Sequence, residues 1–247
     1  MKVKQVFAKQ YVLQNLWPTY IIMNNYLYSL MKKIGTIRSM NDFSRLLREE
    51  LQKELPGIDY QYKMAPVLRL KIQRGQAQKN AAVLILLYPS GNRIHTVLMQ
   101  RTDYPGTHGG QISLPGGKKE EGDPDCISTA LRESQEEIGI IPEKIELLGK
   151  LTDLFIPVSN MLVCPVVGFC HEKPFFKPDP QEVEFLIETP IDHFLDPEMK
   201  KNKARIILFN KALVPYYHIT GHTVWGATAM IISEFEEVLR RIDYHPE

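Results

Sequence analysis

The 247-residue sequence has only three cysteines, no long apolar run and almost no net charge. The cysteines are odd in number and lack the paired spacing of a metal site, so we predict reduced thiols in a cytoplasmic protein: Cys126, Cys164 and Cys170. No stretch approaches the roughly 18 consecutive apolar residues of a membrane-spanning helix. A net charge of +1 argues against general attraction to nucleic acids or membranes. We therefore expect a globular protein with neither as a partner.

Acidic residues are missing from the N-terminal part of the chain, where residues 1–39 carry six Lys or Arg and no Asp or Glu. A transit segment or a membrane-surface helix has this composition. An extension without function, with translation starting at Met31 or Met40, explains it as well, and we favour this second reading. We predict a basic N-terminal extension over residues 1–39, without fixed structure, and one folded domain over residues 40–247.

The domain should begin with a helix, continue mainly as strands and end in a helix. A helix from Asn41 has an apolar face and stops at Pro56: Phe43, Leu46, Leu47, Leu51 and Leu55. Residues 81–88 and 93–101 predict a hairpin around a Pro-Ser-Gly-Asn turn. Further strands are expected at residues 144–151, 161–170, 182–189, 205–210 and 214–219, with a turn at 153–160 and a final helix at 226–241.

Three carboxylates stand at helical spacing in the middle of the chain. Glu133, Glu136 and Glu137 occupy positions i, i+3 and i+4, so a helix places them within about 100° of one face. The opposite face is apolar or small, as in a helix that packs on a core: Ile127, Ala130, Leu131, Ser134 and Ile138. Like charges at this spacing destabilise an isolated helix, and a cation bound between them would turn their repulsion into a stabilising interaction. Because Mg²⁺ and Mn²⁺ prefer carboxylate oxygens, we predict that these glutamates hold such an ion.

Residues 132–140, with the preceding turn Pro115-Gly116-Gly117, resemble the signature of the Nudix hydrolases, Arg-Glu-aliphatic-x-Glu-Glu-x-Gly-aliphatic. The family pattern places a glycine, five residues, a glutamate and seven residues before the arginine. Here Gly117 precedes Arg132 by fifteen positions, one more than that pattern, and the glutamate position counted back from Arg132 holds Pro124. Four acidic residues share this loop, so the register of the expected carboxylate is open: Glu120, Glu121, Asp123 and Asp125.

The segment before this motif is similar to a second signature, that of the coenzyme A diphosphatases within the Nudix family. Arg101, Gly110 and the Pro-Gly-Gly turn fall on its frame, and residues 108–113 match its His-x-Gly-Gln segment. Residues 221–229 also look like the C-terminal stretch of that subgroup. Gly106 departs from the frame because the subgroup has a second arginine there, which puts the exact substrate in question.

The resemblance implies an α/β fold, an α/β/α sandwich with a mixed central sheet, and metal-dependent hydrolysis of a nucleoside diphosphate linkage. The leading substrate is coenzyme A or a derivative, cleaved to 3′,5′-ADP and (acyl) 4′-phosphopantetheine with Mg²⁺ or Mn²⁺. ADP-ribose, NADH or a nucleoside triphosphate is the alternative substrate, and a non-catalytic nucleotide-binding regulator is the alternative of another class. The expected partner is a small CoA-like nucleotide, and a homodimer is compatible with this reading.

The same resemblance assigns roles to particular residues. The expected catalytic residues, three of them also metal ligands, are Arg132, Glu133, Glu136, Glu137 and Glu182. The expected substrate-binding residues are Arg101, His108, Gly110, Gln111, Gly116 and Gly117. The general base is either a motif glutamate acting through metal-bound water or Glu182. Glu182 is equally well explained as a surface glutamate at the end of a strand, without a catalytic role. Trp225 either stacks on a base or anchors sheet to helix, and we favour the anchor.

Overall fold

The computed structural model describes residues 40–66, 79–102, 110–207 and 210–244. The predicted basic extension, Gly106 and His108 lie outside these ranges, so what the sequence predicts of them stays a prediction. Within the described part of the chain, no helix combines the length and apolar character needed to cross a membrane.

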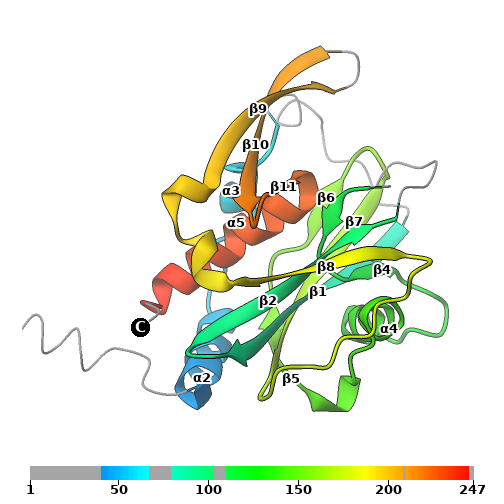
Figure 1. The fold of residues 1–247 in the computed structure, drawn as a ribbon, viewed down its shortest axis with the longest axis vertical. Coiled ribbons are helices and arrows are strands. Elements are labelled where there is room, and N and C mark those ends of the chain that lie inside the picture. The colour runs from blue at the N-terminus through cyan, green and yellow to red at the C-terminus, as the bar shows by residue number, and fades with distance from the viewer. Residues whose placement is uncertain (1–39, 67–78, 103–109, 208–209, 245–247) are drawn as a thin grey trace, which may run out of the picture. The chain divides into compact units, whose positions relative to one another are not determined.

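An eight-stranded mixed sheet forms the centre of the fold (Figure 1). Its strands are β1 (Lys79–Ser90), β2 (Arg93–Arg101), β3 (Ile112–Ser113), β4 (Gly116–Lys118), β5 (Ile145–Lys150), β6 (Leu154–Ile156), β7 (Met161–Cys170) and β8 (Val183–Pro190). The predicted hairpin is confirmed, since β1 pairs antiparallel with β2, while β1 also runs parallel to β7. A strand covered on both faces reads as a continuous apolar run, which explains the sequence of β1.

Helices cover both faces of this sheet, which confirms the predicted α/β/α sandwich (Figure 1). The helix α4 (Cys126–Ile138) packs on β1 and β4, where Leu84 and Leu86 of β1 meet Ala130 and Ile138 in one buried cluster. On the other side lie α5 (Gly226–Arg241), α2 (Met40–Leu51) and α3 (Ile58–Tyr62). A separate three-stranded antiparallel sheet leads into α5: β9 (Lys200–Ile207), β10 (Asn210–Ile219) and β11 (His222–Trp225).

Several elements differ from those predicted. The strand expected at residues 205–210 is observed as β9 (Lys200–Ile207), and the strand expected at 214–219 begins earlier, as β10 (Asn210–Ile219). The first helix ends at Leu51, before the predicted Leu55, where the Lys53 N–H donates to the Glu50 carbonyl and closes the chain into a tighter turn. The short strand β6 forms inside the segment predicted as a turn, where it pairs antiparallel with β7. Its buried residues Leu154 and Ile156 give it an apolar face, but three residues are too short a run to predict a strand from sequence.

The prediction of three reduced thiols is wrong for two of them. Cys126 begins α4 and forms a disulfide with Cys164 on β7, with their Cα atoms 6.2 Å apart. The two cysteines are 38 residues apart in sequence, and only the packing of α4 on the sheet brings them together. The third, Cys170, is a buried free thiol, as predicted.

Candidate active site

Residues at both ends define the length of α4. At its N-terminus the Asp125 carboxylate accepts a hydrogen bond from the Ser128 backbone N–H at 2.8 Å. At its C-terminus Gly139 adopts the left-handed conformation, with φ 71°, and its N–H donates to the Gln135 carbonyl at 3.0 Å. A side chain at Gly139 would also meet Lys177, since an added Cβ would lie 2.8 Å from the Lys177 Cβ. The ends of the helix are therefore set by specific contacts, which fixes the direction of its glutamates.

Glu137 is fully buried between α4 and the sheet. One carboxylate oxygen accepts hydrogen bonds from both terminal nitrogens of Arg101, each at 2.7 Å, and the other accepts from the Gly116 N–H at 2.7 Å. Burial raises the pKa of Glu137 to about 8, while the charge of Arg101 and the Gly116 hydrogen bond act in the opposite direction. Arg101, predicted to bind substrate, thus contacts a predicted metal ligand.

Glu133 lies one helical turn before Glu137, and its side chain is 14% exposed. Its carboxylate passes directly over Gly117, where an added Cβ would lie 2.2 Å from the Glu133 Oε2, so any larger residue there would displace this carboxylate. Burial raises the pKa of Glu133, the Arg132 guanidinium lowers it, and the charges of Glu136 and Glu182 raise it further. The exposed Glu182, which precedes β8, is therefore within electrostatic reach of the helix.

Arg132 connects the carboxylates of this site. Its Nε and Nη2 donate to the two oxygens of Asp123 at 3.0 and 2.9 Å. Its terminal nitrogens also donate to Glu136 at 3.0 Å, to Glu133 at 3.1 Å and to the Lys118 carbonyl at 3.0 Å. The hydrogen bonds from Arg132 to Asp123, together with those from the Glu120 N–H and the Thr129 hydroxyl, hold the pKa of Asp123 well below its usual range.

Asp123 is the site residue that the sequence left unassigned. It is 8% exposed, and its carboxylate also accepts from the Glu120 N–H and the Thr129 hydroxyl, each at 2.9 Å. Counted forward from Gly117, it occupies the position of the family's glutamate, so the extra residue lies between Asp123 and Arg132. A count backwards from Arg132 instead reaches Pro124, so that count alone does not identify Asp123.

The carboxylates are close enough to repel one another, but their oxygens are not arranged as a complete set of metal ligands. Among the described residues, no group of three or more His, Cys, Asp or Glu side chains could hold a metal ion as placed. Glu136 is 59% exposed and turns to Arg132, while Glu137 turns to Arg101. Yet the donor chemistry fits a hard cation, because the charges of Glu133 and Glu182 both raise the pKa of Glu137, and a divalent ion would relieve that repulsion.

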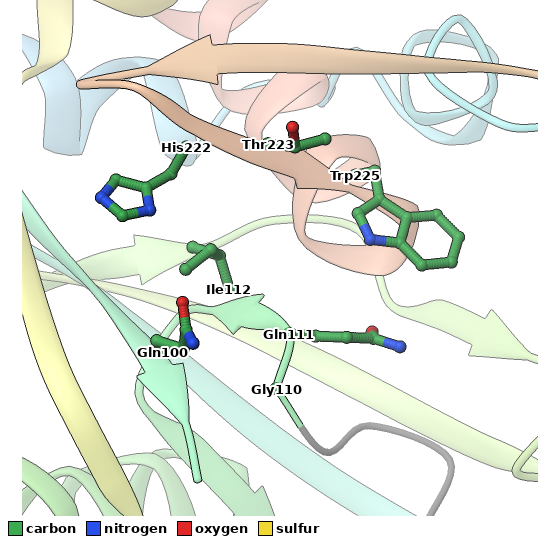
Figure 2. A pocket seen from close by; sticks show the side chains of 7 residues that line it. All are labelled: Gln100, Gly110, Gln111, Ile112, His222, Thr223 and Trp225. Carbon is green, nitrogen blue, oxygen red and sulfur yellow. The ribbon is translucent and has the colours of Figure 1, made fainter. Parts of the chain in front are cut away.

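A separate pocket of about 370 Å³ contains the other predicted substrate residues (Figure 2). It lies between β2, β3 and β11 and is lined, beside Gly110, by Gln100, Gln111, Ile112, His222, Thr223 and Trp225. The structure thus divides the predicted substrate set, since Gly110 and Gln111 line this pocket whereas Arg101, Gly116 and Gly117 contact the glutamates. Trp225, for which we favoured a buried anchor, is half-buried and lines the pocket.

The sequence model of the NUDIX domain matches residues 78–208. A protein described as an uncharacterized Nudix hydrolase, NudL, from Pectobacterium atrosepticum is 36% identical over 185 residues, which covers 71% of this chain and 88% of the relative. This chain belongs to the Nudix family. The Nudix match includes α4 with all its glutamates and ends before β11 and Trp225.

Two further Nudix relatives are longer than the region they share with this chain. Nudix hydrolase 22, chloroplastic, from Arabidopsis thaliana is 34% identical over 192 residues, which covers 75% of this chain and 61% of the relative. Peroxisomal coenzyme A diphosphatase NUDT7 from Mus musculus is 34% identical over 122 residues, which covers 49% of this chain and 51% of the relative. The Nudix chain therefore spans about three fifths of the plant relative and half of the mouse relative.

Proposed function

We propose that this Nudix protein hydrolyses the phosphoric anhydride of a nucleoside diphosphate derivative, with coenzyme A or an acyl derivative as its leading substrate. The observation that carries the proposal is the hydrogen-bonded set on α4, in which Arg132 binds Asp123, Glu133 and Glu136 at once. Such a set orients carboxylates that would repel one another if left unsupported. The products would be 3′,5′-ADP and (acyl) 4′-phosphopantetheine.

Glu133, Glu136 and Glu137 are the residues that would hold Mg²⁺ or Mn²⁺. A bound divalent ion would supply charge stabilisation at the phosphorus oxygens and a water of lowered pKa. Arg132 orients Glu133 and Glu136, and Arg101 fixes the direction of Glu137 through two hydrogen bonds. The general base is either a motif glutamate acting through bound water or Glu182.

Two observations support coenzyme A over the other nucleotides. The mouse relative is named a coenzyme A diphosphatase, and Arg101, Gly110, Gly116 and Gly117 match the first arginine and the glycines of that subgroup's pattern, whereas Gly106 replaces its second arginine. ADP-ribose, NADH and nucleoside triphosphates remain the alternative substrates, and a non-catalytic regulator the alternative class. A homodimer completes the proposal. The cytoplasmic location predicted from reduced thiols loses that support with the Cys126–Cys164 disulfide, so it rests on direct measurement. Cell fractionation tests the location against the peroxisome and chloroplast named for the relatives.

The deciding experiment mixes purified protein with coenzyme A and Mg²⁺ or Mn²⁺ and identifies the products by mass spectrometry. We expect paired release of 3′,5′-ADP and 4′-phosphopantetheine, and a fall of about 100-fold or more in kcat for Glu136→Gln, because that change removes a charged ligand. Glu143→Gln is the matched control, since this glutamate is exposed and lies beyond α4.

Each contrary result has a distinct meaning. Full activity in Glu136→Gln would remove the α4 carboxylates from the chemistry. Intact coenzyme A with turnover of ADP-ribose or NADH would change the substrate and keep the reaction. Binding of all of these nucleotides without turnover of any would favour the regulator.

A further inference from the structure

The pocket between β2, β3 and β11 has two walls of different chemistry (Figure 2). His222 and Trp225 come from β11 and present planar rings, whereas Gln100 from β2 and Gln111 beside β3 present amides. At about 370 Å³ the pocket is within the range of small-molecule sites. Its lining therefore combines flat aromatic surface with hydrogen-bonding groups.

This lining matches a nucleobase better than a phosphate. None of the described residues that line the pocket is Lys, Arg, Asp or Glu, so no formal charge is available there to pair with an anion. Stacking on an aromatic face and hydrogen bonding of base edges by amides are the usual means of holding a base. An indole such as that of Trp225 is the strongest stacking surface among side chains, and it faces the same pocket as the Gln111 amide.

Residues that do not line the pocket hold its lining side chains and backbone in place. The Gln100 amide donates to Glu184 at 2.6 Å, and the His222 ring lies 5.0 Å from the Phe185 ring. The Thr228 hydroxyl at the start of α5 donates to the Ile112 carbonyl at 3.2 Å, which ties the wall that contains Trp225 to β3. Side chains supported in this way form a site that exists before a ligand binds.

Covalent connections place the pocket next to the acidic site. Gln100 directly precedes Arg101, which binds Glu137, and on a strand these two neighbours point to opposite faces. Ile112 is four residues before Gly116, whose N–H also binds Glu137, so the two Cα atoms are at most about 14 Å apart. The pocket and the glutamates therefore lie at the same end of β2 but on opposite faces of that strand, with backbone positions of the two sites at most about 14 Å apart.

We propose that this pocket binds the purine base of the substrate and that Trp225 is its stacking surface. The inference rests on the proposed function in one respect, namely that the ligand is a purine nucleotide whose diphosphate lies at the α4 glutamates. It adds a residue that determines specificity and that lies outside the matched NUDIX region, residues 78–208.

A binding experiment without turnover tests the pocket first. The chain has two tryptophans, so Trp17→Phe leaves Trp225 as the only indole. Titration of this protein with AMP should quench its fluorescence saturably, whereas ribose 5-phosphate, the same molecule without its base, should not. His222→Ala or Gln111→Ala should weaken the AMP response. Equal quenching by ribose 5-phosphate, or none by AMP, would overturn the proposal even if coenzyme A is hydrolysed.

Kinetics then tests the role of the indole in turnover. Trp225→Leu should raise the KM for coenzyme A about tenfold or more, with kcat little changed, because one stacked base is lost in both ground and transition states. Trp225→Phe should restore most of the affinity. Tyr62→Ala, which removes a half-buried aromatic residue of α3 that does not line the pocket, is the control and should leave the KM unchanged.

The outcomes separate this inference from the proposed function. An unchanged KM in a folded Trp225→Leu protein, or an equal rise in Tyr62→Ala, would overturn the role of Trp225. Failure of every nucleotide to be hydrolysed, with AMP still quenching the Trp225 fluorescence, would reject the enzyme and support the base site.

Discussion

The buried carboxyl of Glu137 should make the metal-free protein less stable as the pH rises. Burial raises its pKa from the ordinary 4.5 to about 8, so the folded state holds a proton that the unfolded chain has already released between these values. The contribution of this proton to stability is fully present below about pH 4.5. It is lost progressively as the pH approaches and passes about 8.

The size of the effect follows from the shift of the pKa. One pKa unit corresponds to about 1.4 kcal/mol, so the shift of Glu137 amounts to a loss on the order of 5 kcal/mol across the whole window. A domain is stable by only about 5–15 kcal/mol, so this one group should dominate the pH dependence over that range.

Denaturant unfolding in EDTA, followed between about pH 5 and pH 8, measures this loss. Glu137→Gln removes the titrating group, so its free energy of unfolding should change much less with pH than that of the wild type. Glu143→Gln, at an exposed glutamate, should follow the wild type. Added Mg²⁺ should flatten the wild-type curve, since a bound ion needs the deprotonated carboxylate. Parallel curves for wild type and Glu137→Gln would refute the reasoning.

Three further changes test other parts of the structure. Ser134 is fully buried and its hydroxyl has no hydrogen-bond partner among the described residues. Ser134→Ala should therefore raise the free energy of unfolding, measured in urea, by about 1 kcal/mol. A decrease would contradict this. Gly117→Ala should displace the Glu133 carboxylate and lower kcat by about tenfold or more, with circular dichroism unchanged. Reduction of the Cys126–Cys164 disulfide should lower the free energy of unfolding by about 4 kcal/mol, as expected for a loop of 38 residues, and Cys164→Ser should no longer respond to reductant.

The elements that carry the site could be predicted because their signals are local. The spacing of Glu133, Glu136 and Glu137 against an apolar face predicted α4, and an apolar run of strand length followed by a turn and a second strand predicted the β1–β2 hairpin. The final helix occupies residues 226–241 as predicted. Helical and strand periodicity depend on neighbours within a few residues, so the sequence alone contains them.

The partners of these residues were decided only by the tertiary structure. A one-residue insertion placed Pro124 at the counted position and left the register open among Glu120, Glu121, Asp123 and Asp125, and the ion pair with Arg132 singles out Asp123. Arg101 was expected at the substrate, yet α4 packs on β1, the strand paired with β2, and Glu137 meets Arg101 there.

The disulfide and the pocket depend on the same kind of long-range assembly. Cys126 and Cys164 meet because α4 packs on β7, and the pocket exists because β11 lies over β3 from more than 100 residues further along the chain. Local sequence patterns predict which groups are present and which of the longer segments form helices or strands. The tertiary structure decided which groups meet, because buried charges and thiols interact over a few ångströms of space and not over distance along the chain.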